Sequence, residues 1–304
     1  MKIYKNLIIE KKHTNSVVAI GNFDGIHLGH QKVLRQAKIK SKKERLPFGL
    51  ITFEPMPVMF FNPKVKNHRI NQLNQKKFQL RKFKLDFLVI IRFNKKFSSF
   101  SAEHFIKRII KDKIQSRYIF VSKNFRFGKN RKGNTALLRN YEKKLEYKTI
   151  ITSPLNKSKK IISSTIIRKK IVNGNIKEAN KLLGRLWSIE GRVIKGKKRG
   201  RLIGFPTCNI SMRDYIIPKL GVYSVIVESK QFKKRGIANI GYRPTFNGLN
   251  LLLEVNIFGI NKNLYNKEIK VNFIKFIRSE KKIRDLEQLK EQIKVDIIHA
   301  RKNV

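Results

Sequence analysis

The sequence contains a single cysteine, Cys208, among 304 residues. An internal disulfide and a metal site built from several cysteines are therefore excluded, and one cysteine fits a reducing cytosol. Long apolar runs are also missing. The N-terminal stretch MKIYKNLIIEKK has no apolar segment of signal-peptide length, and no later stretch approaches the ~20 apolar residues that span a bilayer. We therefore expect a soluble, cytoplasmic protein with no membrane partner.

Acidic residues are scarce as well. The chain has 20 Asp and Glu against 70 Lys and Arg, which gives a formal net charge of +50. Such a balance ordinarily indicates nucleic acid or an anionic membrane as a partner. However, the lysines are spread along the whole chain instead of forming a tail or a stripe. We therefore favour a general compositional bias and expect no specific nucleic acid, although a basic nucleic-acid-binding protein on an enzyme scaffold stays open.

Four short apolar runs organise the first half of the chain, and 41% of all residues are hydrophobic, which is enough for a real core. The runs are typical of strands buried on both faces, and stretches with helical periodicity separate them. This alternation predicts a parallel sheet with helices on both faces, where ligands bind beyond the carboxyl ends of the strands. The runs are 17–20, 48–53, 87–91 and 118–122, and the helical stretches include 31–37, 72–83 and 100–114.

The pattern changes after Gly184, which is a helix-stop signal. From Trp187 onward, short runs with alternating polarity are punctuated by glycines, and they predict an antiparallel barrel or sandwich. An amphipathic helix over 285–301 would cover one face or edge. The sequence therefore predicts an α/β domain over 1–184 and a β domain over 185–304.

The stretch VVAIGNFDGIHLGH, residues 17–30, has the pattern of a strand, a glycine-containing loop and a helix. Its glycines let the backbone approach a ligand closely. If His27 and His30 lie on the first helical turn, their i,i+3 spacing places both imidazoles on one face, beside the N-terminal amides that favour anions. The stretch predicts a polyphosphate site, although a lone histidine near a helix start is more often a surface or capping residue.

A second candidate anion site is ISSTIIRKKI, residues 162–171. Ser163 or Ser164 can cap a helix, while Thr165 and the first helical amides face phosphate. Arg168 lies four residues after Ser164 and can return to the same end with its bidentate guanidinium group. An ordinary capped surface helix is the alternative.

In the second half, RGRLIGFPTCNI (199–210) and LLLEVNI (251–257) place polar groups on candidate strands. Residues two apart point to one face of a strand, so Thr207 and Asn209 project together. Their oxygens are hard, neutral ligands that suit a Mg²⁺ also bound by nucleotide phosphates. Alternation leaves Glu254 on a polar face, where a solvated residue is the alternative to an acid–base group. A mere turn before a strand is the alternative for GFPTCN.

These motifs resemble one family along nearly the whole chain. GNFDGIHLGH is similar to the (H/T)xGH signature of nucleotidylyltransferases, in the form found in bacterial bifunctional riboflavin kinase/FAD synthetases, and ISSTIIR resembles the motif that closes that domain. RGRLIGFPTCNI, GVY at 221–223, NIGYRPTF at 239–246, LEVNI and FIRSEKKI resemble the riboflavin kinase domain. The resemblance implies a Rossmann-like nucleotidyltransferase domain followed by a riboflavin kinase-like β-barrel with a terminal helix.

The stretch VSKNFRFGKNRKG, residues 121–133, follows the fourth apolar run. It is not a Walker A loop, because Asn134 follows its last glycine where that motif needs lysine. It resembles the VGxDFRFG loop of the family, with Asn124 in place of the acid. Further departures from the family pattern are Met56, Ser122, Gly259, Asn266 and Ile283.

The resemblance implies an enzyme that phosphorylates riboflavin with ATP to FMN and then adenylylates FMN with a second ATP to FAD and pyrophosphate. It implies Glu254 as the general base on the ribityl 5′-hydroxyl, beside a Mg²⁺ held by Thr207 and Asn209. Another transferase of the same superfamily, with a different phosphorylated acceptor, would fit the first half but not the GFPTCN and LEVNI pairing.

For the adenylyl transfer, the resemblance implies His27, His30 and Arg168 as the groups that stabilise charge on the transferred phosphate. It also implies a set of nucleotide- and flavin-binding residues in the two halves. These are Gly21, Asn22, Phe23, Asp24, Gly29, Asn124, Ser163, Ser164, Thr165, Arg199, Gly200, Gly204, Pro206 and Arg278.

Overall fold

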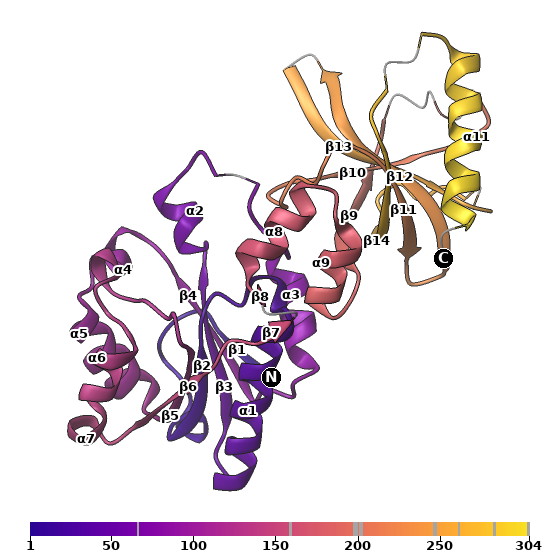
Figure 1. Cartoon of the computed structure of the whole chain (residues 1–304). Helices are drawn as coiled ribbons and strands as arrows, with labels where there is room; N and C mark the ends of the chain where they lie inside the picture. The colour runs from indigo at the N-terminus through magenta and orange to yellow at the C-terminus, as the bar shows by residue number, and fades with distance from the viewer. Residues whose placement is uncertain are drawn as a thin grey trace. The chain divides into compact units, whose positions relative to one another are not determined.

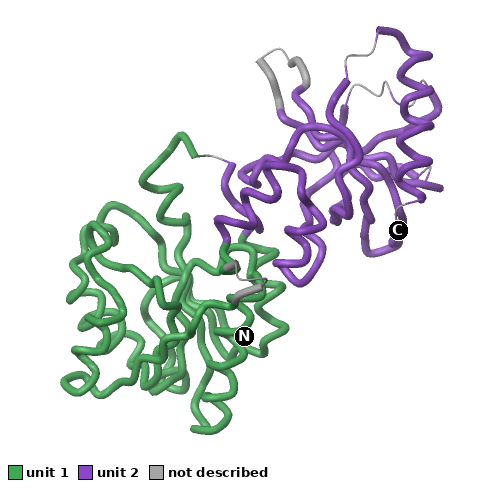
Figure 2. The backbone as a smooth tube through the Cα atoms, viewed as in Figure 1, with its two compact units in different colours: residues 1–66, 73–163 green, residues 67–72, 164–304 purple. Residues whose placement is uncertain are grey.

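The structure is a computed structural model that describes residues 1–65, 67–157, 160–196, 200, 203–245, 248–260, 262–281 and 284–302. The chain forms two compact units (Figure 2). Residues 1–66 and 73–163 form the sheet unit, and residues 67–72 and 164–304 form the barrel unit.

In the described part of the sheet unit, six parallel strands pair in the order β1-β4-β3-β2-β5-β6 (Figure 1). The predicted parallel sheet is confirmed, and the four predicted runs are its inner strands. Both edge strands were missed because they are short and partly polar. The strands are β1 (Lys2–Tyr4), β2 (Ser16–Ile20), β3 (Phe48–Glu54), β4 (Phe87–Arg92), β5 (Ser116–Ser122) and β6 (Lys148–Thr152).

Successive residues of the inner strands face opposite sides of the sheet, which is why their apolar runs are continuous. One side packs against α5 (Ala102–His104), η3 (Phe105–Ile114) and α6 (Thr135–Asn140), and the other packs against α1 (Leu28–Glu44) and α3 (Leu73–Arg81) (Figure 1). The remaining elements are short. They are η1 (Lys11–His13), η2 (Asp24–Ile26), α2 (Pro57–Phe61), α4 (Lys95–Ser98), η4 (Lys129–Arg131), α7 (Glu142–Leu145), β7 (Asn156–Lys157) and β8 (Lys160–Ile161).

In the barrel unit, antiparallel strands close into a barrel in the order β10-β13-β12-β11-β14-β9, so the predicted barrel is confirmed over a sandwich. Its interior is filled by large side chains: the ring centroids of Trp187 and Tyr223 lie 4.7 and 5.3 Å from that of Phe273. The strands are β9 (Trp187–Ile194), β10 (Cys208–Ser211), β11 (Gly221–Glu228), β12 (Lys233–Thr245), β13 (Gly248–Ile257) and β14 (Glu268–Ser279).

The last helix, α11 (Leu286–Lys302), covers part of the outer face of the barrel (Figure 1). Ala300 of α11 is buried in one cluster with Val222 of β11 and Ile237 of β12. The predicted terminal helix that covers a barrel face is therefore confirmed.

The helices α8 (Ser164–Val172) and α9 (Ile176–Leu183) group with the barrel unit, together with residues 67–72. Arg69 forms an ion pair with Asp214, and the indole Nε1 of Trp187 donates a hydrogen bond to the carbonyl of Ile70 (3.0 Å). The compact units thus divide at residues 163 and 164, whereas the sequence places the functional boundary after 184. That functional boundary stays a prediction.

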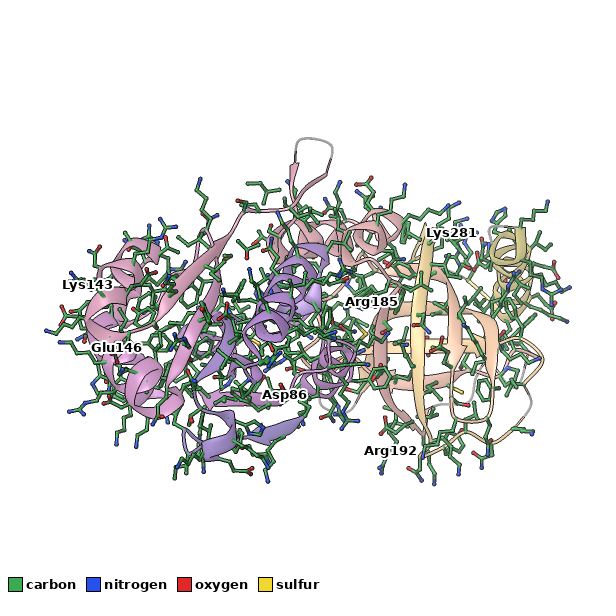
Figure 3. All side chains as sticks on the ribbon, turned by 90° about the horizontal axis from the view of Figure 1, so that it is seen from below. Asp86, Lys143, Glu146, Arg185, Arg192 and Lys281 are labelled. Carbon is green, nitrogen blue, oxygen red and sulfur yellow. The ribbon has the colours of Figure 1, made fainter. Side chains whose placement is uncertain are left out.

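Basic side chains are spread over both units. In the view of Figure 3, nitrogen-tipped side chains surround the outline of both units, with oxygen-tipped ones between them. In the described part of the chain, no helix is both long enough and apolar enough to cross a membrane.

Candidate active site

The first candidate site is the loop at residues 21–27, between β2 and α1. Phe23, Gly25 and Ile26 have φ angles of 47°, 79° and 38°, so the backbone enters the left-handed region three times within four residues. A β-branched residue rarely adopts such a conformation, which marks Ile26 as a strained position held by its surroundings. The loop ends at His27, the N-cap of α1, and brings the start of this helix to the carboxyl edge of the sheet.

The two histidines of this loop and helix lie against each other. Their rings stack with centroids 3.7 Å apart, and the Nδ1 of His27 accepts a hydrogen bond from the amide of His30 (3.3 Å). The Phe23 ring packs 5.1 Å from His30. A Cβ at Gly29 would stand 3.1 Å from the His27 ring and 3.3 Å from the carbonyl of Ile162, so glycine is what allows His27 to pack here. The spacing thus places both imidazoles together.

Two residues that the sequence did not predict as site residues form hydrogen bonds to the backbone of this loop. Lys76 on α3 is 1% exposed, and its Nζ donates to the carbonyl of Asn22 (2.8 Å). The hydroxyl of Thr52 on β3 donates to the same carbonyl (3.1 Å). The available signal was helical spacing: Lys76 lies four residues before the buried Leu80, which places it on the inner face of α3.

Other predicted residues of the sheet unit lie around the same edge. Gly21 directly follows β2, and Asp24 is buried within η2. Because β5 pairs with β2 in parallel, the turn after β5 brings the exposed Asn124 to this edge. Met56, where the resemblance expects histidine, is 1% exposed, so the apolar side chain is buried and no imidazole is supplied there.

An aromatic cluster at the ends of β3 and β4 was not predicted. Phe60 and Phe61 on α2 have ring centroids 5.3 and 5.6 Å from that of Phe93, which follows β4. Phe61 is 66% exposed. A large exposed ring that already packs on other rings offers apolar surface to a planar ligand.

The predicted second anion motif begins α8. Ser163 is the last residue of the sheet unit, and Ser164 begins the longer of the two segments that form the barrel unit. Thr165 is exposed, and the Nε of Arg168 donates to the carbonyl of His68 (2.9 Å). The convergence of these residues with His27 and His30 stays a prediction.

The second candidate site is a row of polar residues across three barrel strands. Asn209 on β10 pairs in register with Glu254 on β13, and Glu254 pairs with Asn239 on β12. Directly paired residues point to the same face of a sheet. Their strand neighbours fill the barrel interior, so the row points outward. Those fully buried neighbours are Ile210, Ala238, Ile240, Leu253 and Val255. Sequence reasoning missed Asn239, because only strand register brings it beside Glu254.

Asn209 has an unusual environment. Its side chain is 7% exposed, and its Oδ1 accepts no hydrogen bond from any residue that the structure describes. Gly196 makes room for it, since a Cβ at that position would overlap the Asn209 amide. Thr207, two residues before Asn209, is exposed. A buried carbonyl oxygen without a donor is costly unless a cation or a ligand donor satisfies it.

The loop before β10 is held in a tight form. The amide of Phe205 donates to the carbonyl of Gly200 (2.8 Å), and Gly204 has a φ of 83°, which favours glycine. The Nδ2 of Asn256, which shares a β13 face with Glu254, donates to the carbonyl of Pro206 (2.8 Å). The strand that carries the candidate base therefore also anchors the candidate metal loop.

A pocket of about 370 Å³ opens beside this loop. Its lining includes predicted site residues and a segment between β13 and β14 for which the sequence predicted no role, including Lys262 and Tyr265. The lining residues are Val193, Gly204, Pro206, Thr207, Cys208, Ile257, Ile260, Lys262, Asn263, Leu264 and Tyr265.

Arg278 on β14 is bound to the terminal helix. Its Nε and Nη2 donate to the two carboxylate oxygens of Asp296 (2.8 and 2.7 Å), and Asp296 is 1% exposed. The guanidinium group thus joins α11 to the barrel, and the role of Arg278 in binding nucleotide or flavin stays a prediction. Two residues named from the sequence, Arg199 and Ile283, lie outside the described residues.

The departure at Asn266 has a physical explanation. Its φ is 62°, in the left-handed region where the resemblance expects glycine, and asparagine tolerates this region better than other side chains. Its amide donates to the carbonyl of Val193 (2.9 Å), which keeps the turn in place. Gly259, with a φ of 70°, likewise occupies a left-handed position.

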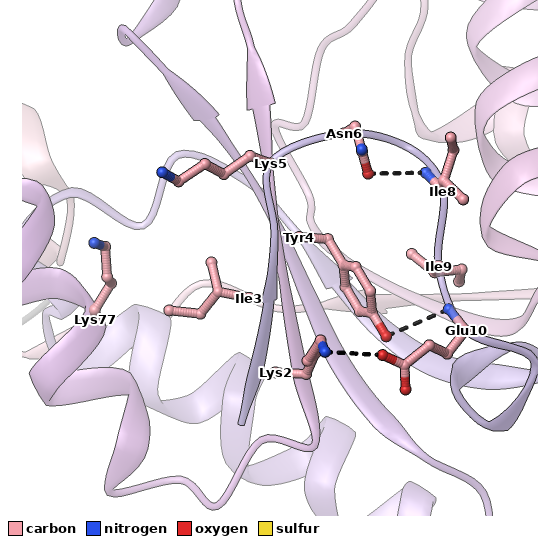
Figure 4. A pocket seen from close by; sticks show the side chains of 9 residues that line it. All are labelled: Lys2, Ile3, Tyr4, Lys5, Asn6, Ile8, Ile9, Glu10 and Lys77. Atoms are coloured by element: carbon pink, nitrogen blue, oxygen red, sulfur yellow. Dashed lines mark hydrogen bonds and ion pairs between the residues drawn. The ribbon is translucent and has the colours of Figure 1, made fainter.

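A larger pocket, of about 660 Å³, lies beside β1 and contains none of the predicted site residues (Figure 4). Lys2, Lys5 and Lys77 are among its lining residues. Lys2 forms an ion pair with Glu10 (3.1 Å), and the hydroxyl of Tyr4 accepts a hydrogen bond from the Glu10 amide (3.3 Å). This pocket lies outside both candidate sites.

Comparisons with known proteins cover most of the chain. A FAD synthetase family model matches residues 9–166, and a riboflavin kinase family model matches residues 183–304. Two curated proteins named bifunctional riboflavin kinase/FMN adenylyltransferase are similar. The one from Buchnera aphidicola subsp. Schizaphis graminum is 44% identical over 95% of this chain and 94% of its own length. The one from Buchnera aphidicola subsp. Acyrthosiphon pisum is 40% identical over 99% of this chain and 98% of its own length.

A solved structure is also similar along nearly the whole chain. It is described as a macrolide-efflux protein from Streptococcus pneumoniae, is 33% identical, and superposes with a TM-score of 0.88 over 98% of each chain.

Proposed function

The chain belongs to the bifunctional riboflavin kinase/FMN adenylyltransferase family, and from this premise we propose how its residues divide the two reactions. It is an enzyme of flavin cofactor biosynthesis that phosphorylates riboflavin to FMN and adenylylates FMN to FAD, each with ATP. We assign the kinase to the barrel and the adenylyltransferase to the parallel sheet. The extents of the two family matches support this division, and nothing supports the nucleic-acid-binding alternative.

The observation that carries the kinase assignment is the outward row of Asn209, Glu254 and Asn239. In the proposed reaction, the ribityl 5′-hydroxyl oxygen attacks the γ-phosphorus of ATP, ADP leaves, and Glu254 accepts the hydroxyl proton. Asn239 is the directly paired neighbour of Glu254, so its amide can orient the carboxylate. The pocket beside Thr207 supplies space for the nucleotide.

Mg²⁺ is a further proposal for the kinase site. The buried Oδ1 of Asn209, which no described residue satisfies, is a hard oxygen ligand of the kind that Mg²⁺ prefers, so the residues fit the ion. Thr207 and Asn209 would hold it. When bound, Mg²⁺ would neutralise charge on the ATP phosphates. The hydrogen bond from Asn256 to Pro206 supports the loop that carries Thr207.

In the second reaction, an oxygen of the FMN phosphate attacks the α-phosphorus of ATP, and pyrophosphate leaves. We propose that His27 and His30, stacked beside the first turn of α1, stabilise the charge that develops on the transferred group. Ser164 and Arg168 are proposed for the same phosphates. The exposed ring of Phe61 is proposed to stack on the flavin, because a planar aromatic ligand needs apolar surface.

One time course tests the whole proposal. The purified chain is incubated with riboflavin, ATP and Mg²⁺, and riboflavin, FMN and FAD are separated and quantified. We expect FMN to rise first and FAD to follow, with one ADP per FMN and one pyrophosphate per FAD. The absence of both products from a folded chain would refute the proposal, and FMN without FAD would refute the adenylyltransferase assignment.

We also propose a cytoplasmic location, which the single cysteine supports. A tagged, active chain should fractionate with cytosolic proteins. Recovery in the membrane fraction after washing with high salt would contradict it.

A further inference from the structure

Lys76 is a buried lysine in a chain whose other lysines mostly face water. It is 1% exposed on α3, while its neighbour Lys77 is only half-buried and reaches Asn74 on the same helix (3.1 Å). Burying an ammonium group is costly unless hydrogen bonds or charges compensate for the lost water. The contacts of Lys76 therefore show what this burial achieves.

Two of these contacts lie at the carbonyl group of Asn22. The Nζ of Lys76 lies 2.8 Å from the carbonyl oxygen of Asn22 and 3.4 Å from the Oγ1 of Thr52. The Oγ1 of Thr52 lies 3.1 Å from the same Asn22 oxygen, and Thr52 is fully buried. Two buried donors from two different elements thus fix the peptide that opens the candidate phosphate loop.

Fixing this carbonyl also fixes the amide next to it. The peptide between Asn22 and Phe23 is planar and trans, so its N–H points away from its C=O. With the carbonyl turned inward to Lys76, the amide of Phe23 is turned toward the open side of the loop. A charged donor on the carbonyl polarises the peptide and strengthens that amide as a donor to an anion. The left-handed φ of 47° at Phe23 then continues the turn toward His27.

We propose that Lys76 is a positioning residue for adenylyl transfer, which holds the Asn22 carbonyl and thereby shapes the loop that receives the phosphates of ATP. This role rests on the proposed function of the loop at residues 21–27. Lys76 itself stays below the loop, and its effect on the reaction passes through the Asn22–Phe23 peptide.

The test is Lys76→Met in the full chain, which keeps an unbranched side chain, one atom shorter, and removes the ammonium group. We expect kcat/KM for ATP in the conversion of FMN to FAD to fall about 100-fold, since small displacements of positioning groups have effects of this size. The inhibition constant of inorganic pyrophosphate should rise together with KM for ATP. The riboflavin kinase activity of the same preparation should stay within about twofold, because its residues lie in the barrel unit.

Two further variants sharpen the test. Thr52→Val removes the second donor to the Asn22 carbonyl at constant volume, and the loss of one hydrogen bond predicts an effect of about fivefold in the same direction. Lys77→Met makes the same charge change one residue further along α3, and it should leave both activities and pyrophosphate inhibition unchanged. A merely structural role for Lys76 would reduce the amount of active enzyme but leave KM and the pyrophosphate constant as they are.

Equal kinetics in Lys76→Met and Lys77→Met would overturn the proposal, as would a loss of rate with unchanged KM and pyrophosphate inhibition. If Lys76→Met does not fold, Thr52→Val decides: wild-type constants in that variant would overturn the role of the Asn22 carbonyl. A wild-type chain that makes no FAD from FMN would instead overturn the proposed function of the loop itself.

Discussion

In the sheet unit, the candidate site residues stand on loops and at a helix start beyond the ends of strands, whereas in the barrel unit Asn209, Glu254 and Asn239 stand within the strands. The loop at residues 21–27 contains left-handed backbone conformations, and Lys76 and Thr52 donate hydrogen bonds to its Asn22 carbonyl. The barrel row is aligned by strand register. Substitution of a residue that supports the loop can therefore change the geometry of the loop site. The row of Asn209, Glu254 and Asn239 changes when one of these residues is substituted or when the register of a strand shifts.

The largest expected effect separates the two units completely. Glu254→Gln removes the proposed base and should lower FMN formation by about 10³-fold, while the conversion of FMN to FAD continues at the wild-type rate. Both rates are measured in one preparation. Glu268→Gln, at an exposed glutamate of another barrel strand, is the matched control and should alter neither rate. If a folded Glu254→Gln chain lost both reactions, the division between the units would be wrong.

The converse change lies in the sheet unit. His30→Gln removes one of the stacked imidazoles and should lower FAD formation from FMN by about 100-fold, the usual scale for one group that stabilises a developing charge. Riboflavin phosphorylation should stay within about twofold. His104→Gln, on α5 of the same unit, provides the comparison. Undiminished FAD formation would exclude His30 from the reaction.

A metal titration tests the barrel row in more detail. Asn209→Ala removes the buried Oδ1, which accepts no hydrogen bond from the described part of the chain, and should raise the Mg²⁺ concentration for half-maximal kinase activity by about tenfold or more. Chelation with EDTA should stop the kinase reaction in the wild-type chain. Ser211→Ala, two residues along β10, should keep the wild-type requirement. An unchanged Mg²⁺ requirement in Asn209→Ala would remove Asn209 from the metal site.

The smallest expected effect concerns the other face of β10. Burial raises the pKa of Cys208 to about 11, and Cys208 pairs with the interior residue Val255. Below this pKa the thiol stays protonated, so alkylation by iodoacetamide should be slow at pH 7 and rise about tenfold for each pH unit up to pH 10. In denaturant, the alkylation rate of the same thiol should reach a plateau above its ordinary pKa of about 8.5. The chain has one cysteine, so mass spectrometry follows it alone. A plateau near pH 8.5 in the folded chain would show that Cys208 is not enclosed.

Sequence patterns predicted the inner strands well because burial on both faces of a sheet demands continuous apolar residues, such as VVAI and FLVII. They missed β1 and β6, where one edge of each strand is open and the demand for apolar residues is weaker. They also predicted the buried face of the segment over 100–114, where Phe105, Ile109 and Ile110 are all buried. Local periodicity carries this information, so no tertiary contact was needed.

Candidate site residues could be found where they share a short motif, as His27 and His30 do. Lys76 and Asn239 were missed because each meets its partner through a contact between distant segments. Lys76 meets Asn22 across 54 positions of the chain. Asn239 meets Glu254 through antiparallel pairing. Neither position stands out in composition, since lysine and asparagine are common throughout this chain.

By itself, the sequence determined the order of the elements, the two kinds of fold and the motifs that can bind phosphate, because apolar periodicity and short motifs act over a few neighbouring residues. Only the tertiary structure decided which lysine is buried next to the loop, which buried amide oxygen accepts no hydrogen bond from any described residue, and which asparagine stands beside Glu254. Those outcomes depend on strand register and on the packing of α3 against the sheet, and these bring together residues that have no relation along the chain.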